Sequence, residues 1–267
     1  MFYAEARNLY ATVNDQAKKI VNNYQKVSAD PYLNDMDNEV DKSTVVEKVD
    51  LGAMEIPVRQ IVGVTSTGPV MEYTYDFKPL AQTDSAFAET WCQLYLDYLS
   101  VRGLREPIAC IEYMGRFYVV DGKKRVSVLK AHGESRVMAN VIRLVPEYSE
   151  SLPVKQYYEF MNYFTKTGLY QVSLSDADDF AYLQKQMGLT PEQAWTEMDQ
   201  FHFMFTFVGV ERAYLKLLGE YASVTAADTF VALLKQYGFS QVRAMQPWDL
   251  EKAIAEVLHL DPSKSVA

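Results

Sequence analysis

Residues 115–133 read GRFYVVDGKKRVSVLKAHG, and this stretch decides the fold. Its first part, FYVVD (117–121), is rich in aromatic and β-branched residues, which is typical of a strand. RVSVLKAH (125–132) has the composition of a short helix, and Gly133 follows it at the C′ position that glycine prefers. The stretch therefore predicts a strand, a glycine-containing turn and a helix in immediate succession.

The turn between these two elements, Asp121–Arg125, carries the chemistry of an anion site. The first amide groups of a helix have no intrahelical acceptor, and the helix start bears about half a positive charge. Three consecutive cations at that pole oppose the helix dipole, and Gly122 lacks a Cβ where a ligand could approach the backbone. An ordinary exposed turn is the alternative explanation of the GKKR sequence. As phosphate ligands we expect Gly122, Lys123, Lys124, Arg125 and Ser127.

The flanking sequence predicts a small sheet around this unit. PIACIEYM (107–114) reads as a strand joined to the next one by a tight turn at Gly115-Arg116. VMANVIRLV (137–145) and IPVRQIVGV (56–64) read as two further strands. The resulting order of strand, turn, helix and strand predicts an α+β fold with a small mixed sheet.

The rest of the chain reads as mainly helical. Steps of three and four between apolar residues predict an amphipathic helix over 3–27, whereas 28–50 is polar, acidic and without period. Ser85 is a good cap for a helix over 86–102, which Gly103 would end. Further helices are expected at 156–168, 177–188, from Thr190-Pro191-Glu192 onward, 226–237 and 247–259, with a strand at 169–175. The predicted domains are an N-terminal helix and linker (1–50), the α+β domain (51–147) and a helical module (148–267).

Charge is distributed unevenly over the chain. The net charge is −9, which disfavours binding along a nucleic-acid backbone. From Arg102 to Arg143 nine basic residues face four acids, a balance of +5, whereas Asp176–Asp261 has six against thirteen, a balance of −7. A local basic segment in an acidic chain favours a small anionic ligand.

Several other classes of protein are disfavoured. No apolar run is long enough to span a membrane, and the first residues do not form a signal peptide, so a cytoplasmic protein is expected. Cys92 and Cys110 lie among apolar residues and are expected to be buried, reduced thiols. Three scattered histidines and two separate cysteines predict no metal site.

The run IACIEYMGRFYVVDGKKRVSVLKAHGESRVMANVI (108–142) resembles the ParB/sulfiredoxin-like superfamily. Gly122 and Arg125 match the framework glycine and the terminal arginine of that family's loop, and Lys124 stands where histidine or arginine is usual. Residues 56–63 and 107–114 resemble the first two strands of the same domain, which would cover about 56–145. Residues 164–188 are similar to the region after this domain in bacterial proteins of unassigned function.

The resemblance implies that the loop holds the phosphates of CTP or of an adenine nucleotide. Hydrolysis or phosphoryl transfer would then require Mg²⁺ with the nucleotide. Sulfiredoxin chemistry is disfavoured because Lys123 stands where that branch has its reactive cysteine. DNA reading of the ParB kind is disfavoured because the acidic C-terminal helices offer no helix-turn-helix. Nucleic-acid binding or nuclease activity and a non-catalytic protein-interaction scaffold remain the alternatives.

Few other side chains qualify for the site. Asp121 is the acid nearest to the loop and the candidate catalytic residue, although capping the helix is its competing role. Arg59, Arg105 and Glu112 are candidate ligand contacts. The aromatic stretches YYEFMNYF (157–164) and FHFMFTFVGVERAYLKLL (201–218) could offer a surface for base stacking. Because they have helical spacing, we expect them to form core instead, with a homodimer interface as the alternative.

Overall fold

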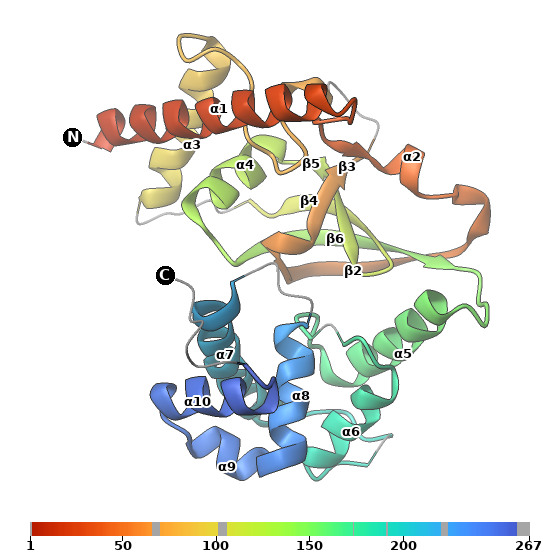
Figure 1. Cartoon of the computed structure of the whole chain (residues 1–267). Coiled ribbons are helices and arrows are strands. Elements are labelled where there is room, and N and C mark those ends of the chain that lie inside the picture. The colour runs from red at the N-terminus through yellow and green to blue at the C-terminus, as the bar shows by residue number, and fades with distance from the viewer. Residues whose placement is uncertain are drawn as a thin grey trace. The chain divides into compact units, whose positions relative to one another are not determined.

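The computed structural model describes residues 2–65, 70–100, 106–172, 174–190, 192–219 and 224–260. The chain divides into two compact units, Met1–Glu147 and Tyr148–Ala267 (Figure 1). The first unit combines helices with a six-stranded sheet, and the described residues of the second unit form helices and their connections. The structure therefore confirms the predicted mixed sheet with helices, followed by a mainly helical segment.

The first unit contains all the strands of the described residues. The strands are β1 (Asn34–Asp35), β2 (Val45–Pro57), β3 (Ile61–Val64), β4 (Ile108–Tyr113), β5 (Arg116–Asp121) and β6 (Arg136–Pro146). The α-helices are α1 (Phe2–Lys26), α2 (Met36–Glu39), α3 (Ala86–Leu99) and α4 (Lys123–His132), with 3₁₀ turns η1 (Lys42–Thr44), η2 (Val58–Gln60) and η3 (Val70–Glu72). The strand order across the sheet is β1-β3-β5-β4-β6-β2.

The centre of the sheet is the hairpin of β4 and β5. These strands are antiparallel, and each has a parallel neighbour on its other side, β6 beside β4 and β3 beside β5. The hairpin turn is Met114-Gly115, both at positive φ (48° and 78°), which matches the twist of the flanking strands. The turn thus lies one residue earlier than the Gly115-Arg116 that the sequence predicts.

One face of this sheet forms part of the core. Residues that are paired across the central strands, such as Ile108 with Ala139 and Cys110 with Val141, are buried. Figure 1 shows α1, α3 and α4 together on one side of the sheet. The predicted helix over 3–27 is α1, and the buried Tyr10 and Asn14 fasten it to the chain by hydrogen bonds to the carbonyl of Ala81 (2.7 and 3.0 Å).

Three predictions for the first unit need correction. The expected linker 28–50 contains β1, α2, η1 and the start of β2, an edge strand whose half-exposed residues give no apolar period. The expected single strand 56–64 is interrupted by η2, so that its first part belongs to β2, at one edge of the sheet, and its second part to β3, which lies between β1 and β5 in the other half. Helix α3 has the predicted Ser85 cap but ends at Leu99, and Gly103 lies outside the described residues.

The second unit packs helices around aromatic side chains. Its helices are α5 (Leu152–Thr167), α6 (Asp178–Gln186), α7 (Glu197–Leu218), α8 (Ala226–Tyr237), α9 (Phe239–Ala244) and α10 (Pro247–Val257). Helix α7 begins after the capping box of Thr196 and Asp199, not at the predicted Thr190. The described part of 169–175 forms no strand, and α9 was not predicted. Phe160 and Phe203, one from each aromatic stretch, lie in the core as expected, and so does Phe230, whereas Phe201 and Phe205 of the second stretch are exposed.

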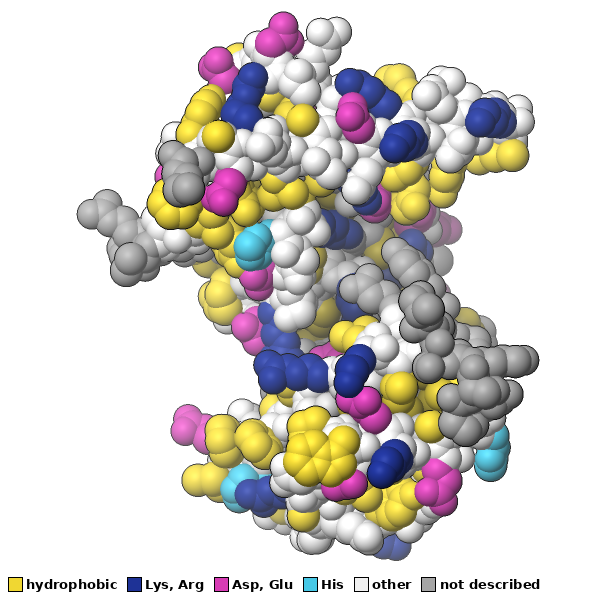
Figure 2. Space-filling view, turned by 60° about the vertical axis from the view of Figure 1, so that its left-hand side comes forward, with side chains coloured by type: hydrophobic (Ala, Val, Ile, Leu, Met, Phe, Trp, Pro, Cys, Tyr) yellow, Lys and Arg dark blue, Asp and Glu magenta, His cyan; other side chains and the backbone are white. Residues whose placement is uncertain are grey.

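The surface carries charges of both signs. On the face shown in Figure 2, the described basic side chains are interspersed with acidic and uncharged ones. Among the described residues, no helix is both long and apolar enough to cross a membrane. Cys92 and Cys110 are buried free thiols, as predicted.

Candidate functional site

Gly122 connects β5 to α4 and is the N-cap of that helix. Its φ of 105° lies in the region that favours glycine, and as a cap it contributes no side-chain hydrogen bond. The helix ends at Gly133, which is again at positive φ (86°), so Gly133 is the C-terminal glycine that the sequence predicts. The predicted succession of strand, glycine, helix and glycine is therefore present.

The space beside Gly122 is filled by the protein itself. A Cβ atom at this position would lie 2.7 Å from Ile108 Cγ2 and 3.2 Å from Arg125 Nε. Both the positive φ and the close approach of the Ile108 side chain thus require glycine here. From the sequence, we interpreted the missing Cβ as making room for a ligand. In the structure, packing against Ile108 and the positive φ already explain the glycine.

Arg125 braces the loop from within. Its Nη2 lies 2.8 Å from Asp121 Oδ2, and its Nη1 donates to the carbonyl oxygens of Glu106 (2.6 Å) and Pro107 (3.2 Å). The Arg125 side chain is only 14% exposed, whereas that of Asp121 is 78% exposed. The guanidinium therefore joins the end of β5 to the segment that precedes β4. Asp121, the candidate catalytic acid, is its ion-pair partner.

Lys124 and Ser127 lie on the side of α4 that faces α3. Lys124 Nζ is 4.6 Å from the ring centroid of Phe87, a cation–π distance. Trp91 Nε1 donates to Ser127 Oγ at 2.9 Å, and both side chains are buried. One turn further along, the Tyr95 ring contacts His132. Because these contacts advance together along both helices, α3 and α4 run parallel.

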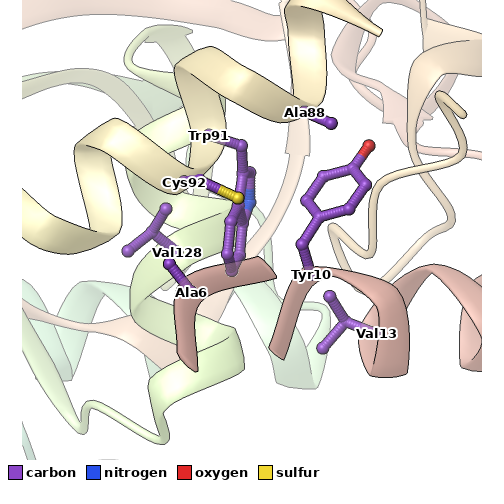
Figure 3. Packing of buried hydrophobic residues seen from close by; sticks show 7 residues of the cluster. All are labelled: Ala6, Tyr10, Val13, Ala88, Trp91, Cys92 and Val128. Carbon is purple, nitrogen blue, oxygen red and sulfur yellow. The ribbon is translucent and has the colours of Figure 1, made fainter. Parts of the chain in front are cut away.

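The contact between α3 and α4 belongs to a larger apolar cluster. Figure 3 shows Trp91 and Cys92 of α3 beside Val128 of α4, with Tyr10 of α1 next to the indole. The rings of Tyr10 and Trp91 meet edge to face at 5.3 Å between centroids. Ser127 is therefore part of this packing layer, which accounts for its burial.

The other two described candidates lie at the opposite end of the sheet from Gly122. Arg59 is in η2, directly before β3, and β3 is parallel to β5, so Arg59 lies where β5 begins. Consistent with this, Lys130 near the end of α4 donates to the carbonyl of Ile61 at 2.8 Å. Gly122 follows the end of β5. The structure thus does not bring Arg59 to the loop, and Arg105 lies outside the described residues.

Glu112 has a structural environment that its sequence position did not reveal. Its buried carboxylate accepts from Arg143 Nε at 2.6 Å and from the amide of Gly115 at 2.7 Å. It therefore holds β4 to β6 and fixes the hairpin turn, again at the end of β5 away from Gly122. The signal that could have found this pair is one charged residue at an inward position in each of two apolar strands.

Lys123 and Lys124 are the other two cations at the start of α4, beside Arg125. Both side chains are half-buried at the positive pole of the helix. The ring of Phe87 attracts the Lys124 ammonium but does not neutralise its charge. Among the described residues, no group of three or more His, Cys, Asp or Glu side chains is placed to hold a metal ion.

No protein-family model matches the chain, and no curated protein matches it.

Proposed function

We propose that the first unit binds the phosphate group of a nucleotide, CTP or an adenine nucleotide, at the start of α4. The observation that carries the proposal is the charge of Asp121–Arg125, where three cations and one acid leave a balance of +2 in a chain of net charge −9. This charge sits at the positive pole of a helix whose glycine cap contributes no side chain.

The roles within the loop differ from one residue to the next. Lys123 and Lys124 are the proposed side-chain ligands, together with the first amides of α4. Arg125 is a positioning residue, because its guanidinium is occupied by Asp121 and by two carbonyl oxygens. Ser127 and Glu112 are left out of the proposed site because their partners are Trp91 and Arg143.

The choice of a nucleotide rests on the resemblance to the ParB/sulfiredoxin-like superfamily. Gly122 and Arg125 occupy the matching positions of the loop, and the order of strand, glycine, helix and strand agrees with that family's pattern. Binding alone is proposed. Asp121 is paired with Arg125, so we derive no catalytic step from it, and any Mg²⁺ would be held by the phosphates of the nucleotide.

A non-catalytic scaffold is the second candidate function. The specific observation in its favour is that Ile108 and Arg125 fill the space on the Cβ side of Gly122. In that case the loop would have been built for packing, and its lysines would contribute only to solubility.

Calorimetric titration of the full chain with CTP, ATP, ADP and GTP, with and without Mg²⁺, tests the proposal. We expect at least one nucleotide to bind, and the double variant Lys123→Ala/Lys124→Ala to bind it at least about tenfold more weakly, as the loss of two charge-assisted contacts predicts. The control variant Lys155→Ala/Lys185→Ala removes the same charge from exposed positions of the second unit and should bind normally.

Two outcomes would contradict the proposal. The absence of heat with every nucleotide, in protein whose first unit is folded, would favour the scaffold. A gel shift with DNA or RNA that falls steeply with salt and requires Lys123, Lys124 and Arg125 would favour the nucleic-acid class instead.

A further inference from the structure

Helix α7 is apolar on two opposite sides. Phe203 and Phe207 point into the core of the second unit and are fully buried. Phe201 and Phe205 each precede one of these residues by two positions, which places them on the opposite side of the helix, and they are 63% and 64% exposed. A helix that is apolar all round is normally buried all round. The outer side of α7 is therefore missing a partner among the described residues.

The outer side of α7 forms one continuous stripe. Met198, which is 60% exposed, Phe201 and Phe205 follow one another at steps of three and four residues, the spacing of a helix–helix seam. The rings of Phe201 and Phe205 are stacked, with 6.3 Å between their centroids. Further along the same side come the exposed Arg212 and then Lys216, whose ammonium is paired with Glu251 of α10 at 2.6 Å. The stripe thus begins apolar and ends basic.

We propose that this stripe is an interface at which a second copy of the chain packs its own α7 in antiparallel orientation. The charges of the helix select both the partner and the direction. Glu197 lies in the first turn of α7 and Arg212 lies toward its end, whereas the Asp199 carboxylate is held by Thr196 in the capping box and Lys216 is paired with Glu251. Antiparallel pairing therefore sets the acidic start of each helix against the basic end of the other, whereas parallel pairing would set like charges together.

The same arrangement also suits the aromatic side chains. When the two helices of 22 residues overlap along their length, the Arg212 guanidinium of one copy lies near the Phe201 ring of the other, which favours a cation–π contact. Phe205 of each copy lies near the middle of the seam, next to Val208 of the other. Both contacts occur twice, as a two-fold interface requires.

Sedimentation equilibrium of the full chain, from about 1 to about 100 μM, tests the interface. We expect a monomer–dimer equilibrium whose dissociation constant rises at least about tenfold in Phe201→Asp/Phe205→Asp, because central aromatic residues dominate such interfaces. The control Val46→Asp/Leu152→Asp changes two apolar residues that are similarly exposed (61% and 65%) and should dimerise normally.

Charge reversal tests the orientation. Glu197→Arg and Arg212→Glu should each weaken the dimer, and the two changes combined in one chain should restore it, because opposite charges again meet across the seam. A chain that stays monomeric throughout, or a dimer that tolerates the change of both phenylalanines, would overturn the proposal. Dimers that ignore the single charge reversals would overturn the antiparallel arrangement. None of these outcomes depends on nucleotide binding.

Discussion

The indole N–H of Trp91 donates a hydrogen bond of 2.9 Å to the hydroxyl of Ser127, and this bond joins α3 to α4 inside the apolar cluster. A buried indole N–H costs free energy unless it finds an acceptor. Ser127 supplies that acceptor from the middle of α4. The position of the helix, and with it the position of the cationic turn at its start, is thereby tied to α3.

Replacing Ser127 by alanine should destabilise the first unit by about 1–3 kcal/mol, because it leaves the Trp91 donor buried without its partner. Hydrogen exchange of the β5 amides measures this loss in the first unit alone. Anion binding by the folded protein should be unchanged. In the control, Trp91→Phe/Ser127→Ala should cost less than the sum of the two single changes. Weakened binding at unaltered stability would instead make Ser127 a ligand.

Replacing Arg125 by alanine should also act on stability. The change removes an ion pair with Asp121 and two hydrogen bonds to carbonyl oxygens, and hydrogen bonds of charged groups contribute about 1.5–3 kcal/mol each when they are well buried. Because Asp121 is largely exposed, its ion pair adds little, and the total loss of stability in Arg125→Ala should be about 1.5 kcal/mol. Hydrogen exchange of the β5 amides measures this loss too, and the control Lys123→Ala/Lys124→Ala should leave that exchange nearly unchanged. Equal protection in the wild-type protein and Arg125→Ala would show that the brace is unimportant.

The turn between β5 and α4 could be predicted from the sequence because its signals are local. Gly122 and Gly133 both adopt positive φ, at 105° and 86°, and each lies directly beside the helix that it delimits. The amphipathic period of α1 is likewise contained within the helix itself. For such elements, neighbouring residues in the sequence carry nearly all the information.

The roles of the side chains in the site could not be predicted in the same way. The partner of Ser127 is 36 residues away in the chain, and that of Lys124 lies on the same distant helix. Arg59 is placed at the far end of the sheet by the parallel pairing of β3 with β5, which is a property of the topology. In the sequence alone, the cations beside Gly122 indicate an anion site. In the structure, Lys124 contacts Phe87 and Arg125 is paired with Asp121, so these side chains also have partners within the protein.

Replacing Glu112 by alanine should destabilise the first unit by about 3–5 kcal/mol, because the buried charge of Arg143 loses its carboxylate. The Gly115 amide would lose its acceptor at the hairpin turn as well. The paired change Glu112→Leu/Arg143→Met removes both charges and should recover most of the loss. Urea unfolding followed by exchange of the β4 and β6 amides measures both effects. A paired variant as unstable as the single one would mean that the pair is needed for more than charge balance.

Raising the pH should destabilise the first unit through Cys110. Burial raises the pKa of this thiol from 9.0 to about 12, so the folded state keeps the proton that the unfolded chain releases. A raised pKa contributes stability that is fully present below about pH 9 and is lost as the pH rises toward about 12. At about pH 10 the loss should be about 1 kcal/mol. Cys110→Ala is expected to lower stability at neutral pH by leaving a small cavity. Its stability should decline less steeply between pH 9 and pH 10 than that of the wild-type protein, because the Cys110 thiol is gone. Cys92 remains in both proteins and does not affect the comparison. Parallel declines in the two proteins would show that ionisation of Cys110 is not coupled to folding.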